Sequence, residues 1–347
     1  MPESSRFSAL KELTSAKIRE FLREPEAVFW VFLFPVLLAV VLGFAFREKP
    51  PDRIPVGVIS GPGAEPAVAA LSRSSALLPK AYPGNEGHEA LRTGKVSLLV
   101  EPGPPVVFHL DETRPDSRIA RLAADDALQR AAGRADRLPV RDRLVTEKGS
   151  RYIDFLIPGL LGMNLMGTGI WSLAFSIVTA RNRRVLKRLI ATPMRRGDYL
   201  LSQIFGRLIF LIPEIALLAG FGWLAFDVPM RGSLLLFFGL CLLGTMSFCG
   251  LGLLIASRVQ TIEGVSGLAN FVMMPMWLLS GVFFSNERFP DVVQPLIRIL
   301  PLSALNDALR GIMNEGHGLA ETAPEIVIIT LWGLVSFAVA LKIFRWK

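Results

Sequence analysis

The run Ala27–Phe46 constrains the fold more than any other part of the chain. It reads AVFWVFLFPVLLAVVLGFAF and contains no charged residue. About 20 apolar residues cross the roughly 30 Å hydrocarbon core of a bilayer, because a helix rises 1.5 Å per residue. The run is too long for the apolar part of a signal peptide, and no A-x-A-like cleavage site follows it. We therefore expect an uncleaved membrane-spanning helix.

Five further apolar runs begin only after residue 150, which leaves one large polar insert behind the first span. The composition agrees with a membrane protein, since 51% of residues are hydrophobic and only 20% are charged, against roughly 25% charged in soluble domains. The sequence predicts an α-helical integral membrane protein with six transmembrane helices, arranged as one and then five. The later spans are expected at 154–179, 200–226, 233–256, 265–284 and 324–344.

Basic residues in one short loop predict the orientation of the chain. Arg181–Arg196, RNRRVLKRLIATPMRR, holds seven basic residues and no acidic one. Loops rich in Lys and Arg stay in the cytoplasm, so this segment is placed there and six spans put both termini on the same side. The insert and residues 285–323 then lie outside. The basic C-terminal residues Lys342, Arg345 and Lys347 agree.

The insert is expected to form a small extracytoplasmic α+β domain. Residues 54–60, 96–101 and 106–110 have the composition of short strands. Residues 64–74 and 116–134 have the periodicity of amphipathic helices. The domain organisation expected is an interfacial helix over 1–26, a first span over 27–46, the insert over 47–153 and a five-helix membrane domain over 154–347.

Three segments are expected to lie at the membrane surface. Residues 5–24 combine apolar residues near helical spacing with lysines and arginines, typical of an amphipathic helix in the plane of the inner interface. It could be an orientation anchor or a docking helix for a partner. In 181–199, an apolar stripe accompanies the basic residues, which suits docking into a partner's groove, although orientation alone would explain the arginines. Residues 285–315 predict broken re-entrant helices that shape an external gate.

The sequence carries no signature of catalysis. A nucleotide-binding loop needs G-x-x-x-x-G-K-[ST], but Gly94 and Lys95 are followed by Val96, and Glu89 stands where the first glycine belongs. No hydrolase or metalloprotease motif occurs, so we expect no catalytic residue and no metal site. Cys241 and Cys249 lie eight positions apart on one helix, about 12 Å, which is beyond disulfide reach.

Polar residues inside spans are costly in lipid and are functional candidates for that reason. Glu214, in the third span, could bind a cationic cargo, carry a proton or pair with an arginine on a neighbouring helix. Arg207 and Gln203 precede it on the same span by about two and three turns. Asn164 and Thr168 in the second span, and Asn270 in the fifth, are either hydrogen-bond links between helices or contacts to cargo. These four residues, Asn164, Thr168, Glu214 and Asn270, are the candidate pathway residues.

The order of these parts resembles the permease subunits of ABC-2 type exporters, in the long form with an external domain between the first two spans. The resemblance runs over nearly the whole chain and rests on five stretches: REPEAVFWVFLFPVLL (23–38), EALRTGKVSLLVEP with VVFHLDETRPDSRIA (89–102 and 106–120), FLIPGLLGMNLMGTGI (155–170), LKRLIATPMRRGDYLLSQI (186–204), and MPMWLLSGVFFSNERFPDVVQPLIRILPLSALNDALRG (274–311). One departure is the stretch 182–185, where many members carry an acidic residue and a glycine and this chain has NRRV.

The resemblance implies a half-transporter in a bacterial inner membrane. A second permease copy or a paralogue would complete the pathway, and cytoplasmic ATPase subunits would bind ATP and magnesium, so that this chain itself holds no cofactor. The cargo would be drug-like, lipid or otherwise amphipathic, and membrane lipid is a further partner. Residues 181–199 would be the cytoplasmic coupling segment, and the coupling residues implied are Arg183, Arg184, Leu186, Lys187, Arg188, Leu189, Thr192 and Pro193.

Other functions are open on the residues alone. A secondary transporter would need inverted repeats, and the long insert after a single span breaks that symmetry. A membrane sensor or assembly scaffold, with a ligand-binding external domain, is the main alternative. Nucleic acid is not an expected partner, because the basic residues cluster at membrane edges without interleaved aromatic residues.

Overall fold

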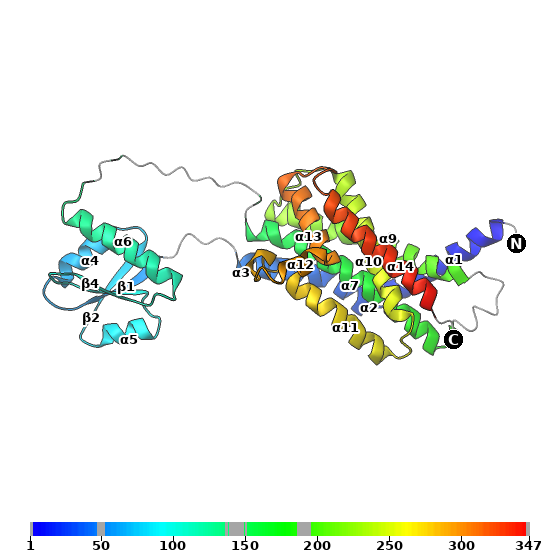
Figure 1. The fold of residues 1–347 in the computed structure, drawn as a ribbon, viewed down its shortest axis with the longest axis horizontal. Helices are drawn as coiled ribbons and strands as arrows, with labels where there is room; N and C mark the ends of the chain where they lie inside the picture. The colour runs from blue at the N-terminus through cyan, green and yellow to red at the C-terminus, as the bar shows by residue number, and fades with distance from the viewer. Residues whose placement is uncertain are drawn as a thin grey trace. The chain divides into compact units, whose positions relative to one another are not determined.

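The computed structural model describes residues 3–46, 53–135, 138, 149, 151–185 and 196–344, and the side chains of these residues except 3–11 and 196–198. The chain divides into two compact units (Figure 1). One contains Met1–Arg47 and Thr146–Lys347, and we call it the membrane unit. The other contains Glu48–Val145, and we call it the insert domain.

Among the described residues, six helices of the membrane unit are long and apolar enough to cross a bilayer, in agreement with the predicted number of spans. The first combines α2 (Pro25–Val28), η1 (Phe29–Leu33) and α3 (Phe34–Ala45). The others are α7 (Tyr152–Asn182), α9 (Arg196–Phe226), α10 (Leu234–Ala256), α11 (Ile262–Leu279) and α14 (Ala323–Ile343). Helix α1 (Glu3–Leu22) precedes the first span. Its place in the plane of the membrane stays a prediction.

Helix α7 is the centre of the membrane unit, in contact with α3, α9, α10, α11 and α13 (Figure 1). Its contact with α10 is backbone against backbone. A Cβ atom added at Gly252 of α10 would come within 2.8 Å of the carbonyl oxygen of Ile170 in α7. Only glycine allows so close an approach, and such small-residue contacts are a common way for helices to pack in lipid.

Broken helices follow the fifth span. They are η2 (Asn286–Arg288), α12 (Gln294–Ile299), α13 (Pro301–Arg310) and η3 (Gly311–Glu315), in the region where the sequence predicts re-entrant segments. The fifth span itself ends earlier than the predicted 284, at Leu279. Ser280 caps it, and Gly281 takes a φ of 65°, a left-handed conformation that turns the chain out of the helix.

The insert domain is a four-stranded sheet in the order β2-β1-β3-β4. Strands β1 (Ile54–Ile59), β2 (Leu77–Tyr82) and β3 (Leu98–Glu101) are parallel, and β4 (Val107–Leu110) is antiparallel to β3. Helix α4 (Ala64–Ser72) connects β1 to β2, α5 (Glu86–Arg92) connects β2 to β3, and α6 (Pro115–Ala131) follows β4.

Side chains of the strands alternate between the two faces of this sheet. Val56, Val58, Leu98 and Val100 are buried in one cluster with residues of α4 and α6. Leu99 points to the other face, where a Cβ added at Gly87 of α5 would lie 2.8 Å from it. Parallel strands joined by helices make an α/β arrangement with one antiparallel edge strand, which differs from the predicted α+β class.

The sequence reading missed β2 and α5, and the missing elements explain the different class. Strand β2 reads LLPKAY, with Pro79 and Lys80 in its middle, and only its first residue is fully buried. Proline and lysine are rare within strands, so they weaken the sequence signal for β2. Both residues suit an exposed sheet edge, where they discourage pairing with other chains.

Candidate functional site: a polar seam between the second and third spans

A buried ion pair lies inside the membrane unit. The Nη2 atom of Arg207 is 2.6 Å from Oε2 of Glu214, two turns further along α9, and their side chains are 4% and 0% exposed. The structure thus pairs Glu214 with an arginine of its own helix, whereas the sequence analysis considered an arginine of a neighbouring helix. Among the described residues, Nε and Nη1 of Arg207 have no hydrogen-bond partner.

Thr168 of α7 joins the pair across the helix boundary. Its hydroxyl accepts a hydrogen bond from Arg207 and lies 3.2 Å from Oε1 of Glu214 and 2.8 Å from the carbonyl oxygen of Asn164. A hydroxyl has one proton, so it donates to one of these two oxygens at a time. With the carbonyl oxygen of Leu165 at 3.4 Å as a further acceptor, Thr168 has alternative partners both on its own helix and on α9.

Asn164 links α7 to the first span. Its Nδ2 donates to the carbonyl oxygen of Val31 at 3.0 Å. In a regular helix that carbonyl would receive the N–H of the residue four positions later, which is Pro35 and has none. The break falls where the helix widens into the π-turn η1, and the Asn164 amide supplies the missing donor.

Helix α1 reaches the same boundary through Lys17. Its Nζ donates to Oγ of Ser176 at 2.9 Å, and Ser176 donates to Oε1 of Gln203 at 2.8 Å. Gly206 makes room for the lysine stem, because a Cβ there would lie 3.0 Å from Cγ of Lys17. The phenyl rings of Phe21 and Phe210 add an apolar contact between α1 and α9, with centroids 4.2 Å apart.

These contacts form one feature that we call the polar seam. It joins four segments. Most of its side chains come from α7 and α9, and α1 and the first span each make one polar contact with them. Its members are Lys17, Asn164, Thr168, Ser176, Gln203, Arg207 and Glu214.

The fourth candidate pathway residue lies elsewhere. Asn270 is exposed on α11. Only 22% of the residues in the apolar stretch of this helix are buried within this chain. Large apolar residues on the same helix are exposed as well, among them Phe271, Met274 and Leu278. The structure therefore brings together Asn164, Thr168 and Glu214 and leaves Asn270 on the outer surface of the unit.

Two predicted coupling residues lie at the end of α7. Arg183 is the C-cap of α7, and Arg184 follows in a left-handed conformation with a φ of 57°. Both side chains are exposed. The other six predicted coupling residues lie outside the described residues: Leu186, Lys187, Arg188, Leu189, Thr192 and Pro193.

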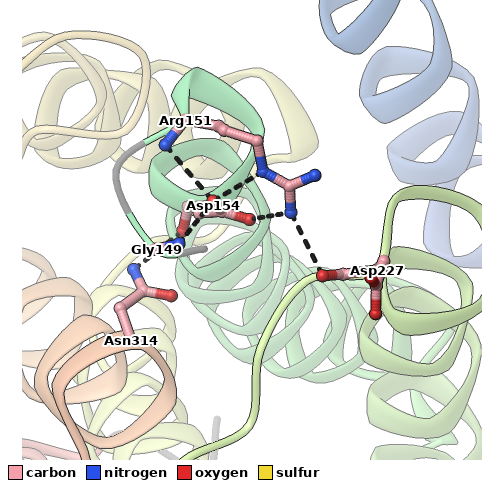
Figure 2. A network of polar contacts seen from close by, with 5 residues as sticks. All are labelled: Gly149, Arg151, Asp154, Asp227 and Asn314. Atoms are coloured by element: carbon pink, nitrogen blue, oxygen red, sulfur yellow. Dashed lines mark hydrogen bonds and ion pairs between the residues drawn. The ribbon is translucent and has the colours of Figure 1, made fainter. Parts of the chain in front are cut away.

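A second polar cluster surrounds the start of α7 (Figure 2). The buried carboxylate of Asp154 accepts from Nε and Nη2 of Arg151 at 2.9 and 2.8 Å, and from the backbone N–H of Gly149 at 2.9 Å. Arg151 also donates to the carbonyl oxygen of Asp227, and Asn314 donates to that of Asp154. The cluster fixes the beginning of α7 against the α9–α10 connection and η3.

Arg310 anchors α13 to α7 and to the turn that follows α11. Its guanidinium lies 3.6 Å from the ring centroid of Phe155 and donates to the carbonyl oxygens of Phe155 and Gly281. Burial lowers the pKa of Arg310 to about 10, against the attraction of Asp307, so it stays charged at neutral pH. Sequence reasoning missed both clusters. The signal available was an Asp or Arg at the edge of an apolar run.

Comparison with known proteins agrees with this architecture. The family profile described as ABC-2 family transporter protein matches residues 26–342. The chain is 30% identical over 174 residues to ABC transporter G family member 20 of Dictyostelium discoideum, covering 49% of this chain and 23% of that protein.

Two Escherichia coli K12 proteins are similar as well. Identity is 26% over 195 residues with the probable multidrug ABC transporter permease YbhS, covering 55% of this chain and 50% of YbhS. Identity is 25% over 215 residues with the inner membrane transport permease YadH, covering 60% of this chain and 78% of YadH. The matches thus span half or less of the first two relatives. Because the family profile covers most of the chain, including all six spans, this protein belongs to the ABC-2 family of transporter proteins as a multi-pass membrane permease.

Proposed function

We propose that this chain is the membrane subunit of an ATP-driven exporter. ATP and magnesium bind to separate cytoplasmic ATPase subunits, and this chain forms half of the pathway. The family assignment carries the proposal. The absence of a nucleotide-binding loop from the sequence is consistent with hydrolysis by a partner.

The pathway lies between two copies of the permease. The exposed face of α11 supports this, because an amide such as Asn270 is costly against lipid and favourable against a second protein surface or a cargo. The exposed apolar side chains around Asn270 fit an amphipathic cargo, either drug-like or lipid. YbhS carries the description of a probable multidrug permease, which points to the same class of cargo.

The polar seam transmits movement from the ATPase to the spans. A buried ion pair with unsatisfied donors contributes little net stability compared with an apolar packing. The contribution of the ion pair to transport is that its groups can exchange hydrogen-bond partners, as the Thr168 hydroxyl can. ATP binding by the partner favours one arrangement of the helices, and the population shifts toward it. Helix α1 and the coupling segment are the two docking elements.

Purification in mild detergent tests the proposal directly. The tagged chain should bring down a stoichiometric ATPase with a phosphate-binding loop, and the complex should hydrolyse ATP. In inside-out vesicles, it should move a fluorescent amphipathic probe inward only when ATP is present. A double charge reversal, Arg183→Glu with Arg184→Glu, should leave insertion intact and abolish ATP-dependent movement.

A chain that purifies alone and moves no probe would favour the sensor or scaffold alternative. In that case, the insert domain would be the ligand-binding part, and ligand addition rather than ATP should alter the membrane unit.

A further inference from the structure

One arginine contacts the ends of three spans at the predicted cytoplasmic side. Arg181 lies in the last turn of α7 and is partly buried. Its Nη1 atom donates to the carbonyl oxygen of Ala256, the last residue of α10, at 3.0 Å, and also to that of Val259. Its Cζ atom lies 5.6 Å from the ring centroid of Phe344, the C-cap of α14.

The chemical groups in this contact favour strong hydrogen bonds from Arg181. The last carbonyl groups of a helix have no partner within the helix, and the C-terminus carries a partial negative charge. A guanidinium satisfies both, because it is always charged and can donate to two oxygens from one planar group. Hydrogen bonds from a charged donor are roughly twice as strong as neutral ones. An aromatic ring within about 6 Å adds a cation–π contribution.

The position of Arg181 in the chain gives the contact a mechanical consequence. It is two residues before Arg183, the first predicted coupling residue, so this turn of α7 is where a movement of the coupling segment would be passed on to α7. Val259 lies in the short connection from α10 to α11, which begins at Ile262. The same side chain therefore also holds the base of the exposed helix α11.

We propose that Arg181 is a positioning residue that makes the ends of α7, α10 and α14 move as one body when the partner ATPase displaces the coupling segment. This inference rests on the proposed function and adds a specific route to it. Displacement of α7 carries α10 and α14 along rigidly, and α11 pivots about the base that Arg181 holds.

Distances between spin labels test this in the purified complex. Labels at Asn182→Cys and Gln260→Cys report on the end of α7 and on the connection after α10 that Arg181 holds, and both residues are exposed. Labels at Asn182→Cys and Leu278→Cys report on movement of α11, where Leu278 is 69% exposed. The native Cys241 and Cys249 are fully buried, so the labels go to the introduced cysteines.

In the otherwise unchanged chain, ATP with vanadate should shift the 182–278 distance by about 2 Å or more and leave the 182–260 distance unchanged. In Arg181→Leu, both distances should shift. Arg258→Gln is the matched control, because it removes an exposed positive charge nearby without touching the contact, and it should behave as the unchanged chain.

A nucleotide-dependent 182–260 distance in the unchanged chain, or a fixed one in folded Arg181→Leu, would overturn the proposal. If Arg181→Leu does not fold, Arg181→Lys decides, since it keeps the charge but loses the planar fork. It should broaden the 182–260 distribution even without nucleotide, and a distribution as narrow as that of the unchanged chain would contradict the inference. If neither distance responds to ATP in any variant, the proposed function fails, while the nucleotide-free broadening still tests the contact itself.

Discussion

The two sides of α7 differ in how they hold their neighbours. Toward α10, the contact is backbone on backbone, with Gly252 against the carbonyl of Ile170. Toward α9, the contact is the polar seam, in which side chains such as Thr168 and Glu214 meet. A backbone contact has one geometry, whereas a hydroxyl or a guanidinium can exchange partners. The comparison therefore contrasts a backbone contact toward α10 that allows one geometry with a contact toward α9 whose hydrogen bonds can be exchanged, as the proposed function requires.

The largest expected effect comes from breaking the buried ion pair. Arg207→Met leaves the fully buried Glu214 carboxylate unpaired, which should destabilise the protein by about 3–5 kcal/mol. Thermal unfolding in detergent, followed by tryptophan fluorescence, measures this.

The double variant Arg207→Met with Glu214→Leu is the matched control, because it removes both charges together. It should recover most of the lost stability but not the ATP-dependent movement of cargo. If the double variant is as unstable as the single one, the seam is structural, and the contrast between the two sides of α7 is lost.

A side chain at Gly252 should cost less, about 1–3 kcal/mol, because the helices can separate slightly around it. Gly252→Ala places a Cβ atom 2.8 Å from a backbone oxygen. Gly267→Ala is the control within a neighbouring span, since none of the described residues comes within 4 Å of its Cβ position. Equal melting temperatures for the two variants would show that α7 and α10 are not tightly fixed.

Removal of the Asn164 amide should cost about 1 kcal/mol, in the range measured for hydrogen bonds between membrane helices. Asn164→Leu leaves the carbonyl of Val31 without its donor. The additional variant Pro35→Ala restores a backbone N–H four residues after Val31 and should reduce the penalty of Asn164→Leu. A penalty that does not depend on residue 35 would contradict the assignment of Asn164 as the substitute donor.

The smallest effect is expected at Ser176, which is half-buried and links Lys17 to Gln203, because Lys17 keeps its ion pair with Glu20 at 3.0 Å when the hydroxyl is removed. Ser176→Ala should change unfolding by roughly 0.5–1 kcal/mol yet increase proteolysis near α1, because α1 loses its polar contact with α7. Ser266→Ala, on the exposed side of α11, is a control for loss of a hydroxyl. Identical cleavage of both variants would argue that apolar packing alone holds α1.

Sequence reasoning reached part of the seam. Periodic polar residues within apolar runs are visible directly, so Asn164, Thr168 and Glu214 could be singled out. Arg207 was noticed because it lies two turns from Glu214 on one helix. Lys17 and Ser176 could not be joined, since 159 residues separate them and each alone resembles an ordinary surface lysine or packing serine. Pro35 was visible, but its effect on Val31 depends on which helix lies opposite.

Six apolar runs and one large polar insert are visible in the amino-acid sequence alone, because hydrocarbon thickness and the cost of burying charge act on each segment separately. The positions of polar groups within the spans are visible there too. Which of these groups meet depends on the fold. It paired Arg207 with Glu214, brought Arg181 to the ends of α10 and α14, and added β2 to the insert sheet, because such contacts depend on the packing of segments far apart in the chain.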